Sequence, residues 1–173
     1  MAIMKKTATL FLLLVTLVAT VAFAADEPLS GHYVLDAKAS DNVAKAIDNT
    51  VAKMNFITRP IARGRLEKTN PAYSMITLSF PGSNISVQLE NRKPIVFPAS
   101  GAAVKWTRED GETFDVSGRV AGSSLTQTFV AEDGKRVNVF TLSADGKTLT
   151  LNVTVTSPRL PKALNYKLVY HRA

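Results

Sequence analysis

The 173-residue chain contains no cysteine and only two histidines, His32 and His171. The lack of cysteine excludes disulfide bonds, zinc sites with cysteine ligands and attachment of a lipid to an N-terminal cysteine. No cluster of histidine and acidic residues occurs, so we predict no metal site and no cofactor. Stability must therefore come from buried apolar side chains and from hydrogen bonds between strands.

The sequence also lacks the motifs of common enzyme classes. A Gly-x-Ser-x-Gly elbow is absent, and the nine glycines are scattered as turn residues instead of forming a phosphate-binding loop. A catalytic triad is assembled in space, so an enzyme on this scaffold stays a minor alternative. Our prediction is that the protein is not an enzyme and that both histidines are surface or barrel-seam residues.

Long apolar runs are absent except for residues 10–22, which follow Lys5 and Lys6 and end in Ala22-Phe-Ala24. A basic start, a short apolar core and a small-x-small ending are typical of a secretory signal peptide. The run is shorter than the ~20 residues that a membrane-spanning helix needs. We therefore predict cleavage after Ala24, with no stable membrane span afterwards.

The rest of the chain, residues 25–173, has the length of one domain with a sizeable core. Export predicts a periplasmic or secreted protein. Small secreted eukaryotic domains usually need disulfide bonds, so the lack of cysteine favours a bacterial periplasm. The sequence leaves the oligomeric state open.

Acidic residues are fewer than basic ones, 14 against 21. The basic residues are spread along the chain, and their only loose cluster is Arg59, Arg63, Arg65 and Lys68. No nucleic-acid-binding motif accompanies this cluster, so nucleic acid is not an expected partner. An anionic ligand or a lipid headgroup is the alternative to simple solvation of these side chains.

Apolar and polar residues alternate along most of the chain after Tyr73, as in half-buried strands. Asp-Gly pairs begin at residues 110, 133 and 145 and indicate tight hairpin turns. The predicted strands are residues 31–36, 75–80, 85–89, 94–97, 104–107, 114–120, 125–130, 137–142, 149–155 and 166–170. We predict a mainly β fold, an antiparallel up-and-down barrel of about 8–10 strands, with a two-sheet sandwich as the alternative.

A helical insert is predicted over residues 40–65, directly after the first strand. Ser40 is the expected N-cap, with Asp41 in the first turn. Pro60 interrupts the pattern, so a second short helix or turn is expected over residues 60–65, ended by Gly64. One face of the insert, expected to lie on the barrel as a lid, carries Val43, Ile47, Val51 and Met54.

Alternate residues of a barrel strand point inward, where a ligand pocket combines apolar walls with a few orienting polar groups. Several inward faces mix aromatic side chains with polar ones, which would suit an amphipathic ligand with an acidic head. The candidate ligand-binding residues are Arg119, Gln127, Phe129, Arg136, Phe140, Tyr166, Tyr170 and Trp106. The alternative is that these side chains only fill a core.

One strand, a helical insert of about twenty-five residues and then a run of antiparallel strands resembles the calycin group, and most closely the fatty-acid-binding proteins. The opening Gly31-His-Tyr-Val-Leu-Asp36, with Ser40, also resembles the start of lipocalin-like chains. The resemblance implies a helix-lidded barrel that binds an apolar ligand. The last strand, residues 166–172, lacks the Arg-x-Tyr pair with which fatty-acid-binding proteins hold a carboxylate, so no site residue is transferred.

We therefore predict a periplasmic, lipocalin-like barrel that binds a small apolar or amphipathic, lipid-like molecule. The alternative is an envelope protein-interaction or structural module with a filled barrel and no ligand. Its interface would use exposed apolar residues of the helical insert or Leu160, in the loop between the last two strands.

Overall fold

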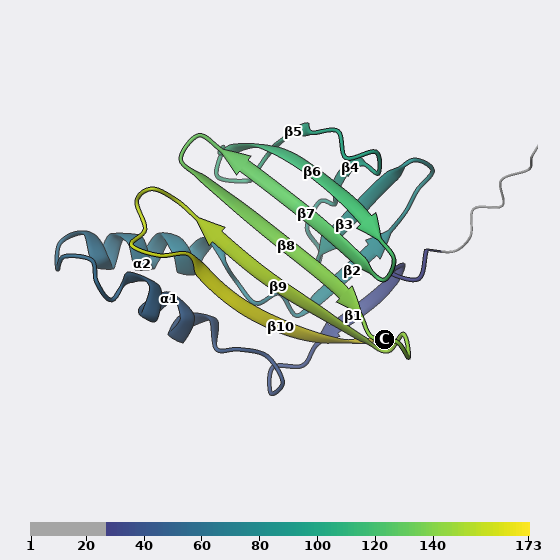
Figure 1. The fold of residues 1–173 in the computed structure, drawn as a ribbon, viewed down its shortest axis with the longest axis horizontal. Helices are drawn as coiled ribbons and strands as arrows, with labels where there is room; N and C mark the ends of the chain where they lie inside the picture. The colour runs from purple at the N-terminus through teal and green to yellow at the C-terminus, as the bar shows by residue number, and fades with distance from the viewer. Residues whose placement is uncertain (1–26) are drawn as a thin grey trace, which may run out of the picture.

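The computed structural model describes residues 27–173, which form a ten-stranded antiparallel barrel with two helices inserted after the first strand (Figure 1). This arrangement confirms the predicted fold class. The predicted signal peptide, residues 1–24, lies outside the described residues. The strands are β1 Gly31–Leu35, β2 Met75–Ser79, β3 Asn84–Leu89, β4 Ile95–Pro98, β5 Val104–Thr107, β6 Thr113–Ala121, β7 Ser124–Ala131, β8 Gly134–Leu142, β9 Thr148–Thr156 and β10 Leu164–Arg172.

The barrel is nearly closed. Its first and last strands, β1 and β10, pair antiparallel, and the hydrogen-bonded order runs without a break from β4 through β1 and β10 to β5. Only β4 and β5, at the two ends of this order, are not hydrogen-bonded to each other. The strands thus form one continuous sheet, and the two-sheet sandwich considered as the alternative is wrong.

Period-2 alternation in the sequence becomes alternation of burial in the strands. On β7, Gln127 is buried between the outward-facing Thr126 and Thr128. The inward faces of β7 and β10 carry Leu125, Gln127, Phe129, Leu164, Tyr166, Leu168 and Tyr170. Because a strand exposes alternate residues to opposite faces, these patterns fix which side chains line the interior.

All three Asp-Gly pairs lie at hairpin turns, between β5 and β6, β7 and β8, and β8 and β9. Gly111 and Gly146 have φ angles of 89° and 71°, in the left-handed region that glycine tolerates. Gly134 differs, since it is the first residue of β8 and pairs with Ala131 across a two-residue turn. At that position an added Cβ would lie 3.1 Å from the carbonyl oxygen of Thr156.

Helix α1, Val43–Val51, begins later than predicted. Its N-cap is Asn42, whose Oδ1 accepts from the Lys45 amide at 3.0 Å. Ser40 is not the cap, because its Oγ donates to the Asp36 carbonyl at 2.7 Å and accepts from the Val169 amide at 2.8 Å. Asp41 also lies before the helix, and its Oδ2 accepts from the Lys167 amide at 2.7 Å. Both residues tie the start of the insert to β10.

Helix α2, Thr58–Thr69, extends the insert four residues beyond the predicted end at Arg65. Pro60 is its third residue, where the missing N–H would have had no partner within the helix. Asn55 lies three residues before the helix, and its Oδ1 accepts from the Ile57 and Thr58 amides at 3.0 and 2.9 Å. Gly64 lies in the helix interior and does not end it.

The end of the barrel away from the helices is closed by residues 28–30, the β8–β9 turn and the end of β10 (Figure 1). Arg172 donates to the carbonyl oxygens of Pro28, Ser30 and Gly146, and its guanidinium lies 5.0 Å from the ring centre of Tyr33. The opposite end of the barrel, beside α2, holds a cavity.

Candidate functional site

A cavity of about 720 Å³ occupies the helix end of the barrel. Its lining includes residues of α2 and of the β5–β6, β7–β8 and β9–β10 connections. The walls are largely apolar and include Leu66, Ile95, Phe129, Phe140, Leu151 and Leu168. This volume falls within the range of about 300–1,000 Å³ typical of small-molecule sites. The interior of the barrel is therefore not filled by the protein's own side chains. The interaction-module alternative requires a filled interior.

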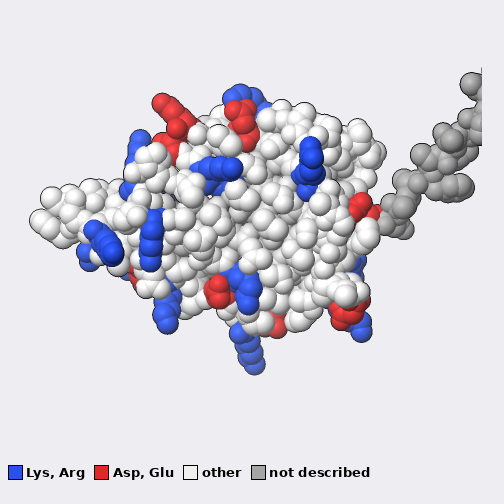
Figure 2. Space-filling view, in the orientation of Figure 1, with Lys and Arg blue, Asp and Glu red and all other residues white. Residues whose placement is uncertain are grey.

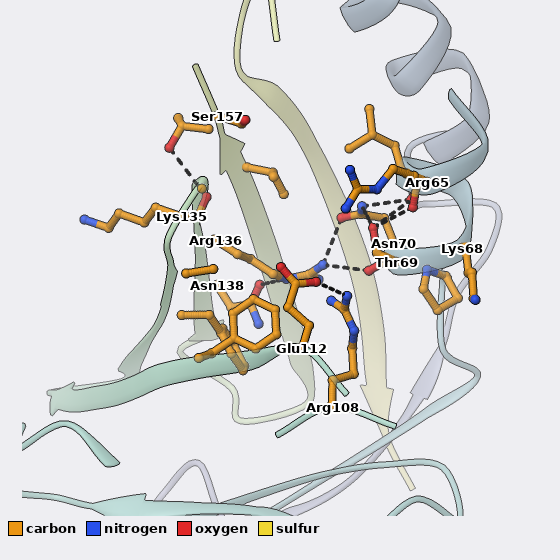
Figure 3. A pocket seen from close by; sticks show the side chains of 18 of the residues that line it. Arg65, Lys68, Thr69, Asn70, Arg108, Glu112, Lys135, Arg136, Asn138 and Ser157 are labelled. Atoms are coloured by element: carbon orange, nitrogen blue, oxygen red, sulfur yellow. Dashed lines mark hydrogen bonds and ion pairs between the residues drawn. The ribbon is translucent and has the colours of Figure 1, made fainter. Parts of the chain in front are cut away.

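Arg136 of β8 is at the centre of the polar groups in this cavity (Figure 3). Its Nη1 donates to Asn70 Oδ1 at 2.8 Å and to the Thr69 carbonyl at 3.3 Å, at the C-terminal end of α2. Its Nη2 donates to the Tyr166 hydroxyl at 3.2 Å, and its Nε donates to Asn138 Oδ1 at 2.8 Å. Arg136 thus connects the helical insert to the barrel wall.

This network fixes the orientation of two buried amides. Because an arginine only donates, Asn138 must turn Oδ1 toward Arg136, which leaves its Nδ2 to donate to Gln127 Oε1 at 3.0 Å. The Nε2 of Gln127 then points away from Asn138. It has no acceptor among the described residues although Gln127 is only 1% exposed.

The positive charge of Arg136 has only neutral partners. Within residues 27–173, no ion pair joins Arg136 to an aspartate or glutamate. A partly buried guanidinium without a counter-ion attracts an anion more strongly than a solvated one does. Arg65 and Lys68 of α2 also line the cavity and add positive charge at its helix side (Figure 3).

Arg108, by contrast, is neutralised where it lines the cavity. It forms ion pairs with Asp110 and Glu112 in the β5–β6 hairpin, and its guanidinium lies 5.1 Å from the ring centre of Phe114. The hydrogen bond from Arg108 lowers the pKa of Asp110 to about 2. This cluster therefore carries a carboxylate charge at all but very acidic pH.

Three aromatic rings form one wall of the cavity. Trp106 lies 5.9 Å from Phe114 and 5.7 Å from Phe129, and the last two rings are edge to face at 6.0 Å. Such edge contacts add to the stabilisation from apolar burial. The rings present an apolar surface beside the polar network.

Two tyrosines of β10 contribute neutral polar groups. The Tyr170 hydroxyl donates to the Tyr73 carbonyl at 3.1 Å, and Tyr166 donates to Asn70 at 3.3 Å. Burial raises the pKa of both hydroxyls, and for Tyr166 the Arg136 charge partly offsets that effect. Both tyrosines are therefore neutral hydrogen-bonding groups near neutral pH.

The structure brings most of the predicted site residues together. The candidates that line the cavity are Trp106, Gln127, Phe129, Arg136, Phe140 and Tyr170. Tyr166 is connected to them through its hydrogen bond with Arg136. Arg119 is not brought to the cavity, because it is exposed on the outer face of β6, between the inward-facing Gly118 and Val120.

The predicted lid face packs mainly into the core. Ile47 and Val51 are buried at 1% exposure, and Val43 packs beside them, yet none of the three lines the cavity. Met54, just after α1, does line it. The helix that covers the cavity is α2, through Ala62 and Leu66, which the lid prediction did not include.

Several residues of the site were missed from the sequence. Asn70 is only 3% exposed and holds Arg136 from 66 positions away, and nothing local marks it. Asn138 shares the inward face of Arg136 by alternation, which was an available signal. Arg65 and Lys68 belong to the loose basic cluster, whose position in the fold was unknown.

The histidines lie outside the cavity. His32 Nδ1 is hydrogen-bonded to Thr77 Oγ1 at 2.9 Å, and His171 Nε2 lies 3.1 Å from Asp36 Oδ2. In the described part of the chain, no three His, Asp or Glu side chains gather as a metal site would need. Over the same residues, no helix has the length and apolar character to cross a membrane.

Solved fatty-acid-binding proteins share this fold. The REP1-NXSQ fatty acid transporter aligns over 84% of this chain and 96% of its own, with a TM-score of 0.53 and 14% identity. A Schistosoma mansoni fatty acid binding protein in complex with arachidonic acid covers the same shares, with a TM-score of 0.53 and 19% identity. Fatty-acid-binding protein 1 of Echinococcus granulosus covers 85% and 98%, with a TM-score of 0.52 and 11% identity.

No protein-family model and no curated protein sequence matches the chain. At identities below 20%, the structural similarity establishes the fold and not the ligand. It confirms the calycin-like, fatty-acid-binding-protein-like resemblance drawn from the order of strands and helices.

Proposed function

We propose that this protein binds a small amphipathic, lipid-like molecule with an acidic group in the cavity under α2. The observation that carries this proposal is Arg136, a cavity-lining cation with only neutral partners among largely apolar walls. Burial of an apolar chain supplies most of the affinity, and attraction to Arg136 orients the acidic group. The fatty-acid ligands named for the solved proteins of this fold support the same class of molecule.

The proposed role is binding and not catalysis. No histidine of the described residues lines the cavity, and its ionised carboxylates near Arg108 are held in ion pairs. We also propose that binding takes place outside the cytoplasm, in the periplasm or after secretion. The basis is the sequence of residues 1–24, with its basic start, apolar core and Ala-Phe-Ala ending.

Native mass spectrometry and displacement of a fluorescent fatty-acid probe test the binding proposal. The purified protein is expected to carry or take up a fatty acid. Arg136→Met should weaken binding of the acid about tenfold while leaving binding of the corresponding fatty alcohol unchanged. Arg119→Met is the matched control, because Arg119 is exposed outside the cavity. A protein of apo mass that displaces no probe contradicts the proposal.

Cell fractionation tests the proposed location. Expression of the full chain in a bacterium should give a periplasmic or secreted product whose mass corresponds to a start at Ala25. Recovery of the full-length chain in the cytoplasm contradicts this part of the proposal.

The interaction-module alternative keeps one observation in its favour. Phe56, Ile57 and Ile61, in the α1–α2 connection and α2, are 84%, 62% and 62% exposed. In Figure 2 the tip of the helical insert shows no charged side chain on the visible face. Leu160 does not add to this surface, because it lines the cavity. Under our proposal, replacing all three exposed residues with serine should leave ligand binding intact. Under the alternative, the same change should abolish binding of the protein partner.

A further inference from the structure

Gln127, a residue of the cavity lining, has a hydrogen-bond donor that the protein leaves unused. Its Nε2 is the one buried side-chain nitrogen or oxygen of the described residues without a hydrogen-bond partner. The side chain is 1% exposed and lines the cavity. Leaving a buried donor unpaired is unfavourable. A ligand oxygen that accepts from this donor removes that cost, so the hydrogen bond contributes more binding free energy than usual.

Rotation of the amide does not remove this unpaired donor. The Asn138 amide is oriented by Arg136, so its Nδ2 faces Gln127. A reversed Gln127 would bring its Nε2 against that Nδ2, and two donors would then face each other. The donor therefore stays unpaired within the protein as long as the Arg136–Asn138–Gln127 chain of hydrogen bonds is intact.

The donor lies deeper in the barrel than Arg136. Gln127 is directly opposite Asn138 in the β7–β8 pair, and Asn138 is two residues further along β8, about 7 Å from Arg136. Leu125 and Phe129 flank Gln127 on the same face of β7. A carboxylate would lose much solvation in that apolar setting, for which one amide N–H compensates poorly, whereas a neutral oxygen loses far less.

We propose that the ligand carries an uncharged hydrogen-bond acceptor, a keto, hydroxyl or ester oxygen, which Gln127 Nε2 binds several atoms from the acidic group. Gln127 is then a specificity-determining residue that selects oxygenated chains over plain ones. This inference rests on the proposed function, since it assumes that an amphipathic acid enters the cavity with its charge near Arg136.

The test is equilibrium binding of hexadecanoic acid and of a series of its mono-oxo derivatives, with the ketone moved along the chain in steps of two carbons. The wild-type protein should bind at least one isomer about tenfold more tightly than hexadecanoic acid, with a clear optimum of position. Gln127→Met should abolish that preference, so that hexadecanoic acid and the oxo isomers bind with similar affinity.

Two further variants make the result specific to the donor. Gln127→Leu also removes the amide N–H, with a different apolar side chain, so it should lose the preference too, which covers the case of a poorly folded Gln127→Met. Gln88→Met is the matched control, because Gln88 does not line the cavity, and it should keep the wild-type preference.

The outcomes separate the two proposals. If the wild-type protein binds hexadecanoic acid but no oxo isomer more tightly, the inference about Gln127 is wrong and the proposed function stands. It is equally overturned if Gln127→Met weakens hexadecanoic acid as much as the best oxo isomer, because the donor then binds the acidic head. If the protein binds none of these compounds, the proposed function itself fails.

Discussion

The ring of Phe97 on β4 occupies the space where Gly118 on β6 would carry a side chain. A Cβ added at Gly118 would lie 2.3 Å from Phe97 Cε2 and 3.0 Å from the carbonyl oxygen of Thr126. Phe97 is 1% exposed, and β4 is not hydrogen-bonded to β5. The contact between ring and backbone thus covers the one gap in the barrel's hydrogen-bonded sheet.

Gly118→Ala should therefore destabilise the barrel. The added methyl group must displace a buried ring or shift the backbone, and overpacking of this kind lowers the free energy of unfolding by about 1–3 kcal/mol. Urea unfolding, monitored by the fluorescence of Trp106, measures this decrease in the free energy of unfolding.

Gly64→Ala is the matched control, because nothing lies within 4 Å of a Cβ at that position in α2. It should raise the free energy of unfolding by about 0.5–1 kcal/mol through helix propensity. Equal stability of Gly118→Ala and the wild type would show that the Phe97 ring can move out of the gap between β4 and β5 without a cost in stability.

Arg172→Met should loosen the closed end of the barrel. Arg172 donates to Pro28, Ser30 and Gly146 at 2.7, 2.6 and 2.8 Å, so it joins the segment before β1 to the β8–β9 turn. Hydrogen bonds from a charged donor are stronger than neutral ones, but the side chain is exposed, so we expect a loss of about 1–2 kcal/mol.

Hydrogen exchange locates the effect of Arg172→Met. Amides of residues 29–33 should exchange faster, while α2 and the cavity keep their protection. Faster exchange spread over the whole barrel would contradict a local role for Arg172.

Strands were predictable from the sequence because their signals are local. Alternation of apolar and polar residues and turn residues between the runs placed all ten strands within a few residues of their observed bounds. The same alternation would have excluded Arg119, since Val116 and Gly118 on the same strand face inward. The predicted helix start was wrong because Ser40 and Asp41 do not cap the helix. Their side chains accept hydrogen bonds from amides of β10, more than 120 positions away.

The site was only partly predictable because its polar groups meet across the fold. Gln127, Asn138 and Arg136 lie on neighbouring strands, so register and alternation bring them together. Asn70 and Tyr166 reach Arg136 from 66 and 30 positions away, and only the closed barrel with its insert places them there. The unpaired nitrogen of Gln127 follows from that assembled network and has no signature in the sequence.

Ser40→Ala should release the start of the helical insert from the barrel. The mutation removes the hydrogen bonds of Ser40 Oγ with Asp36 and Val169, and the expected loss is about 1 kcal/mol. Hydrogen exchange should show faster opening of α1 with little change in β6 to β8. Ser100→Ala is the control, because its hydroxyl makes only a 3.4 Å contact in an exposed loop. Unchanged exchange in α1 would contradict the anchoring role.

Stability should fall steeply at alkaline pH because of the buried tyrosines. Burial raises the pKa of Tyr170, Tyr166 and Tyr33 above the ordinary value of 10.0. Below pH 10 these hydroxyls are protonated in both the folded and the unfolded chain, so they do not make the free energy of unfolding depend on pH. As the pH rises further, the unfolded chain releases protons that the folded barrel retains, so the free energy of unfolding decreases.

Tyr170→Phe tests the largest of these contributions. A tyrosine that stays protonated only in the folded state lowers the free energy of unfolding by up to about 1.4 kcal/mol per pH unit. Urea unfolding between about pH 9 and 11 should therefore show a shallower decline for Tyr170→Phe than for the wild type. At neutral pH the variant should lose only the hydrogen bond to the Tyr73 carbonyl. Equal slopes for the two proteins would mean that Tyr170 reaches solvent before the barrel unfolds, which would place an alkaline opening at the cavity itself.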